Sequence, residues 1–111
     1  VMNTGEQEAD LTLWANGVAE ALDEKERPEL AAVFRAFARR DGEAVRKAVG
    51  VFSPAMLDAL AEMVELEQRD RMEADQERSV ELLDWLGRLV GQARDAHLMI
   101  DVEPGEDAPV Q

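Results

Sequence analysis

Apolar residues recur three and four positions apart in every part of the chain that has a regular pattern. This spacing places them on one face of an α-helix, and it differs from the strict alternation of a half-buried strand. The pattern predicts helices near residues 10–23, 28–40, 42–50 and 54–98. The fold class is therefore predicted to be all-α: a small bundle of four to five helices with a long C-terminal helix or a helical hairpin.

Local signals support three of these helix starts. Pro28 and Pro54 suit the first turn of a helix, where the missing N–H would have no partner in any case. Asp41 and Ser53 can each cap the helix that follows, because a side-chain oxygen can accept a hydrogen bond from a free N–H of the first turn. Gly50 can end the third helix.

The longest segment, 54–98, allows two structures. Glycine and proline are absent from most of it, and its residues are mostly strong helix formers, which favours one continuous helix. The apolar stripe nevertheless turns polar over 67–79, and helices average about 11–12 residues, which favours a turn near 70–76. Both alternatives stay open on the sequence alone.

The polar interval from Glu67 to Ser79 is expected to face solvent in either structure. Glu67, Arg71 and Arg78 stand where the preceding stripe would place leucines. Proline at Ala74 is expected to distinguish the alternatives, because it would destabilise a continuous helix and be tolerated in a turn.

One domain fits a length of 111 residues. Residues 1–8 are polar without an apolar period and are expected to be disordered, and residues 101–111 are expected to form a disordered acidic tail. The helical domain between them, 9–100, has few large aromatic residues for its core. Burial against a second copy would compensate for so thin a core.

Acidic side chains dominate the chain, whose formal net charge is −13. Such a charge favours basic protein partners and repels nucleic acid at long range. One segment departs from this balance, since residues 27–50 contain six basic side chains and three acidic ones.

Candidate catalytic and metal-binding residues are sparse. The chain has no cysteine, and His97 is its only histidine, so neither a thiolate site nor a histidine cluster can form. Ser53 and Ser79 both stand near predicted helix starts, and no glycine-rich phosphate loop follows a strand. We therefore expect no enzyme, no cofactor and no metal site.

The last part of segment 54–98 carries two apolar stripes, a wider arc than one neighbouring helix can cover. Gly87 and Gly91, four residues apart, would allow another backbone to approach closely. This pattern predicts a homodimer. The residues expected at the contact are Val80, Leu83, Leu86, Gly87, Val90 and Gly91.

The basic segment offers an alternative function. Two short helices joined near Asp41 are similar in outline to a helix-turn-helix, in which the second helix enters the major groove. The residues that would contact phosphate are Arg35, Arg39, Arg40, Arg46 and Lys47. No Asn, Gln, Ser or Thr lies within 30–50 to contact base edges, so nucleic-acid binding is the weaker interpretation.

The leading interpretation is a non-catalytic helical protein-interaction module: an adaptor, assembly chaperone, inhibitor or regulator that pairs with itself and with a basic protein surface. No apolar run is long enough to span a membrane, and the N-terminal residues lack the features of a signal peptide, so a cytoplasmic location is expected. The frequent use of Ala, Arg, Asp, Glu and Val is typical of a high-GC bacterium or its phage.

Overall fold

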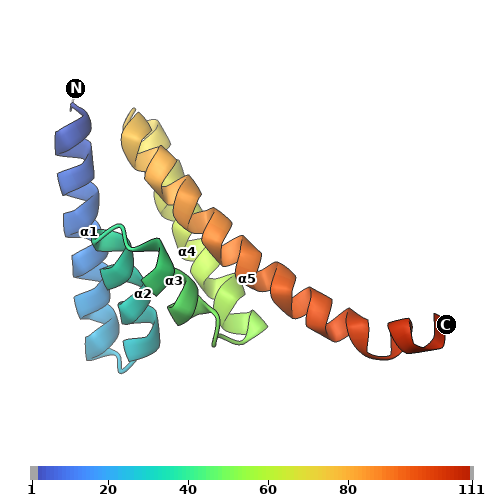
Figure 1. Cartoon of the computed structure of the whole chain (residues 1–111). Coiled ribbons are helices and arrows are strands. Elements are labelled where there is room, and N and C mark those ends of the chain that lie inside the picture. The colour runs from blue at the N-terminus through green and yellow to red at the C-terminus, as the bar shows by residue number, and fades with distance from the viewer. Residues whose placement is uncertain (1–2, 111) are drawn as a thin grey trace.

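A computed structural model of the chain describes the backbone of residues 3–110 and the side chains of residues 3–97. It contains α1 (Thr4–Glu24), α2 (Pro28–Ala38), α3 (Gly42–Val49), α4 (Pro54–Glu73) and α5 (Glu77–Val110) (Figure 1). Strands are absent from the described residues, so the predicted all-α class is confirmed. The predicted disordered tail, 101–111, lies beyond the described side chains and stays a prediction.

Caps at two helix starts confirm the sequence signals. The Ser53 hydroxyl accepts a hydrogen bond from the N–H of Met56, and the Asp41 carboxylate accepts one from the N–H of Ala44. Proline stands at the start of both α2 and α4. These residues satisfy or remove N–H groups that have no partner within the first turn of a helix.

The first helix begins earlier than its apolar pattern indicates. The prediction of disorder over residues 1–8 is wrong for those that are described, because α1 starts at Thr4. The Asn3 side chain accepts from the Glu6 N–H at 2.8 Å, and the Glu6 carboxylate accepts from the Asn3 N–H at 3.0 Å. This reciprocal capping box stabilises a polar first turn, which apolar periodicity does not reveal.

Segment 54–98 contains a turn, so its two helices form a hairpin. Asp75 adopts a left-handed conformation with φ of 59°. Its N–H donates to the carbonyl oxygen of Met72 at 3.1 Å, and the Gln76 N–H donates to that of Arg71 at 2.9 Å. This pair of hydrogen bonds is the Schellman motif, which ends α4 and reverses the chain.

The same motif ends α1 and α2. Glu26 and Arg40 take the position of Asp75, each with φ of 59°. Glycine is the usual residue there, because a side chain in the left-handed region costs about 1–2 kcal/mol. No glycine occupies any of the three positions, which explains why the sequence near Asp75 contains no recognisable turn signal.

α2 and α3 lie between the C-terminal part of α1 and the hairpin of α4 and α5 (Figure 1). The N-terminal part of α1 contacts the hairpin directly. The largest side chains that are fully buried come from four of the helices: Leu11 of α1, Phe34 and Phe37 of α2, Leu57 and Leu60 of α4, and Leu83 and Leu86 of α5. Trp14 packs edge-on against Phe34, with ring centroids 5.6 Å apart. Part of the wide apolar arc of α5 is therefore covered by other helices of the same chain.

Candidate interaction surface

A buried arginine stands where the apolar stripe of α4 is interrupted. Arg71 is only 8% exposed. Its guanidinium donates to Glu67 at 2.6 Å, to Gln76 at 2.8 Å, and to the carboxylate of Asp10 on α1. Arg71 therefore joins α1, α4 and the turn before α5 through charge-assisted hydrogen bonds.

A second set of polar contacts joins α1 to the start of α5. The Gln7 side-chain oxygen accepts from the N–H of Arg78 at 2.7 Å, and the Arg78 guanidinium donates to Glu8 at 2.7 Å. Ser79 is fully buried, with its hydroxyl 2.9 Å from Oε1 of Gln76. The expectation that 67–79 faces solvent is thus wrong for Arg71 and Ser79, because α1 supplies polar partners that cover them.

The predicted nucleic-acid residues divide into two groups. Arg35 is paired with Asp23, and that carboxylate raises the pKa of Arg35. Arg40 lies over the ring of Phe37 and donates to the carbonyl oxygens of Phe37 and Glu8, while burial lowers the pKa of Arg40. Both arginines therefore have structural contacts. The other three predicted nucleic-acid contacts are exposed: Arg39, Arg46 and Lys47.

The residues predicted for the dimer contact also fall into two groups, one buried and one half-buried. Leu83, Leu86 and Val90 are fully buried within a single chain. These three residues are therefore removed from the predicted dimer contact, because they pack in the chain's own core and present no surface to a second copy. Val80, Gly87 and Gly91 are half-buried and line a surface between α4 and α5.

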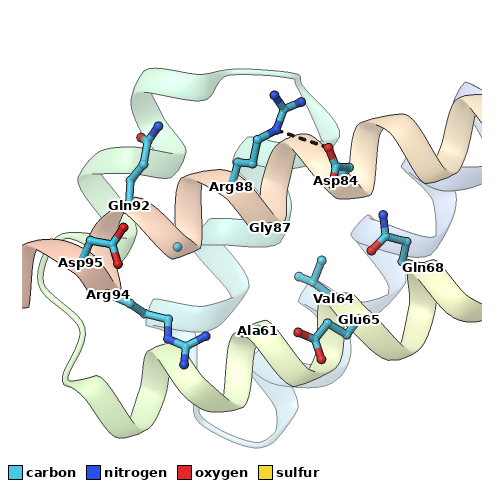
Figure 2. Close-up of a pocket in the computed structure, with 11 residues that line it drawn as sticks. Ala61, Val64, Glu65, Gln68, Asp84, Gly87, Arg88, Gln92, Arg94 and Asp95 are labelled. Carbon is cyan, nitrogen blue, oxygen red and sulfur yellow. Dashed lines mark ion pairs between the residues drawn. The ribbon is translucent and has the colours of Figure 1, made fainter. Parts of the chain in front are cut away.

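A cavity of about 500 Å³ opens between α4 and α5 around these two glycines (Figure 2). Ala61 and Val64 of α4 line it opposite Gly87 and Gly91 of α5. A Cβ atom added at Gly87 would lie 3.8 Å from Val64, and one added at Gly91 would meet nothing within 4 Å. The missing side chains thus leave room for atoms of another molecule.

Polar contacts between α4 and α5 stand at both ends of this cavity. The Gln68 amide donates to the carbonyl oxygen of Val80 at 3.3 Å. Arg94 and Asp58 form an ion pair of 3.0 Å near the other end. These contacts join the two helices on either side of the cavity.

A second cavity, of about 330 Å³, lies at the tip of the hairpin and is lined by Met72, Gln76 and Val80. Met72 is 61% exposed. Two stripes at helical spacing run past both cavities: Ala61, Glu65, Gln68 and Met72 on α4, and Val80, Asp84, Gly87 and Gly91 on α5. The two cavities share no lining residue but follow the same faces of α4 and α5. They are here named together the outer groove, with a glycine section and a tip section.

Acidic side chains border the outer groove. Glu65 and Asp95 lie at the glycine section, and Asp75, Glu77 and Glu81 lie at the tip section. The arginines at the glycine section already have acidic partners, since Arg88 pairs with Asp84 at 3.3 Å and Arg94 pairs with Asp58. Figure 2 shows the first of these pairs. The border of the groove is thus negatively charged.

The residues considered for catalysis have structural contacts. Ser53 caps α4, Ser79 lies in the buried polar contacts, and the His97 ring contacts the carbonyl oxygen of Phe52 at 2.8 Å. Within the described residues, no group of three or more His, Cys, Asp or Glu side chains is placed to hold a metal ion.

Comparison with protein-family models, with curated proteins and with solved structures gives no match to this chain. Among the described helices, none is both long enough and apolar enough to cross a membrane.

Sequence reasoning identified one side of the outer groove and missed the other. The sequence predicts a contact surface at Val80, Gly87 and Gly91. Gln68 and Met72 of α4 lie in the polar interval 67–79, for which the sequence predicts only exposure to solvent. The helical spacing of Gln68 and Met72 from Ala61 was available as a signal. Their position opposite α5 became apparent only with the turn at Asp75.

Proposed function

We propose that this protein is a non-catalytic helical interaction module and that the outer groove of the α4–α5 hairpin is its binding surface. The observation that carries the proposal is the cavity around Gly87 and Gly91. The cavity combines four small or apolar residues, Ala61, Val64, Gly87 and Gly91, with a border of charged and polar side chains. Such a space between two helices can accept an apolar side chain of a partner helix in close packing. The polar contacts of Gln68 and Arg94 join α4 and α5 on either side of that space.

Gly91 allows binding to be separated from folding. Since a Cβ there meets nothing within 4 Å, Gly91→Leu should fill the groove without displacing the hairpin. Leucine is also the better helix former by several tenths of a kcal/mol or more, so stability should rise slightly. Gly17 on α1 is a matched control, because it too is helical and its Cβ would also meet nothing within 4 Å.

The test compares proteins captured from source-cell extract by three immobilised forms: the native chain, Gly91→Leu and Gly17→Leu. A partner should be retained by the native chain and by Gly17→Leu, and lost from Gly91→Leu. Circular dichroism should show the same helix content for all three. Equal capture by all three forms, or capture of nothing by any of them, would refute the outer groove as the binding surface.

A further inference from the structure

We infer that the occupant of the outer groove is a cationic amphipathic helix of another protein, an inference that rests on the proposed function. Its apolar side chains would enter the glycine and tip sections. Its Lys and Arg side chains would meet the acidic border. Recognition of an amphipathic helix by an apolar groove is a common mode of protein binding, in which charges flanking the groove add specificity.

The charges of the groove favour a cation over any other occupant. Four carboxylates on its border, those of Glu65, Asp75, Glu77 and Asp95, take part in no ion pair among the described residues. The nearby arginines are already engaged, because Arg78, Arg88 and Arg94 each contact an acid of this chain. An approaching cation therefore finds acidic groups that no basic side chain of the chain has neutralised.

The length of the acidic border sets the size of the occupant. Glu77 and Asp95 are 18 positions apart on α5, which corresponds to about 27 Å of helix. A partner helix of roughly five turns, about 18 residues, would reach both ends. It would place apolar residues against Met72 and Val80 at the tip and against Gly87 and Gly91 further along.

A second copy of the chain fits the same surface poorly. Each copy carries a formal charge of −13, and a two-fold contact would bring the same four carboxylates toward one another. The core of the single chain already covers Leu83, Leu86 and Val90, the strongest apolar residues of the predicted dimer contact. Charge therefore favours a basic partner over a second copy.

Three synthetic 18-residue peptides test the inference against the labelled full chain by nuclear magnetic resonance. The first is an amphipathic helix of Ala, Leu and Lys, the second has Glu in place of Lys, and the third is a scrambled version of the first without helical periodicity. The amide signals of Val80, Gly87 and Gly91 report on the groove. We expect the first peptide to shift these signals and the other two to leave them unchanged.

Each other result overturns the inference in a distinguishable way. Equal shifts with the Glu peptide would show a groove that binds helices without regard to charge, which leaves the proposed function standing. Equal shifts with the scrambled peptide would show attraction of any cation. Shifts of the same signals with chain concentration alone would identify a second copy as the occupant. No shift with any peptide refutes a cationic helix, while the proposed function is still decided by the capture experiment.

Two charge variants distinguish the effect of the groove carboxylates on binding from the effect of the chain's overall net charge. The groove variant combines Glu65→Gln, Asp75→Asn, Glu77→Gln and Asp95→Asn. The control variant, Glu24→Gln, Glu26→Gln, Glu29→Gln and Glu43→Gln, removes the same number of exposed carboxylates elsewhere. The groove variant should bind the Lys peptide at least about tenfold more weakly at low salt, while the control should change affinity much less. Equal loss in both variants would contradict recognition at the groove.

Discussion

The conformation of Asp75 predicts opposite effects of alanine and glycine at this position. With φ of 59°, a side chain at residue 75 lies in the left-handed region, where an L residue costs about 1–2 kcal/mol. Glycine avoids this cost but loses about 0.5–1 kcal/mol more backbone entropy on folding. Asp75→Gly should therefore be more stable than Asp75→Ala by about 1 kcal/mol.

A continuous helix through residue 75 would reverse the order of stability of these two variants. Alanine in a helix interior is more stable than glycine by about 1 kcal/mol. The stability of Asp75→Gly relative to Asp75→Ala therefore differs by about 2 kcal/mol between the turn and a continuous helix. The wild-type aspartate should lie between them in the turn, since Asp tolerates the left-handed conformation better than most residues.

Urea denaturation followed by circular dichroism measures the free energy of unfolding of each variant. Asp70 supplies an internal control, because it is exposed within α4 and has the same side chain. Asp70→Ala should be more stable than Asp70→Gly, the reverse of the order at Asp75. A difference of 1 kcal/mol corresponds to roughly 4–8 °C in Tm for a domain near this size. The same order at both positions would refute the turn.

Further predictions concern other contacts of the fold. Arg71→Met should cost about 2–3 kcal/mol of unfolding free energy in urea denaturation, because it removes hydrogen bonds to two carboxylates and an amide in a nearly buried site. Ala74→Pro should cost about 3 kcal/mol in the same assay even though the chain turns there, because the Ala74 N–H donates to the carbonyl oxygen of Asp70 at 3.1 Å; an unchanged urea midpoint would contradict that bond. Gly91→Ala should raise stability by up to about 1 kcal/mol, measured as a higher urea midpoint. Binding of duplex DNA through the predicted contacts should show a slope of log K against log salt no steeper than about −3 per chain, because only three of the five, Arg39, Arg46 and Lys47, are exposed and without a structural partner among the described residues; a slope near −5 would contradict this assignment.

Proline at Ala74 does not distinguish the two geometries, because the Ala74 N–H donates a hydrogen bond in the turn as it would in a continuous helix. The final turn of α4 keeps its hydrogen bonds up to Gln76, so proline at residue 74 is harmful in both geometries. Asp75 is the residue at which the two geometries differ, because only there does φ change sign. The substitution that distinguishes a hairpin from a continuous helix is therefore placed one residue later than the sequence suggested.

Local interactions determined what the sequence could predict. The side chains of Asp41 and Ser53 reach N–H groups only three residues away, and Pro28 and Pro54 restrict their own backbone, so these helix starts depend on neighbouring residues alone. The apolar period likewise follows from the geometry of one helix. The helical class and most helix boundaries could therefore be predicted from the sequence.

Only the tertiary structure decided which helix covers each residue. Leu83 and Val80 both belong to the apolar arc of α5, yet contacts with other helices bury Leu83 completely and leave Val80 at the outer groove. Arg71 is buried because Asp10, distant in the sequence, supplies a carboxylate beside it. The helical period determines which residues share a face, but burial and pairing depend on segments that only the folded chain brings together.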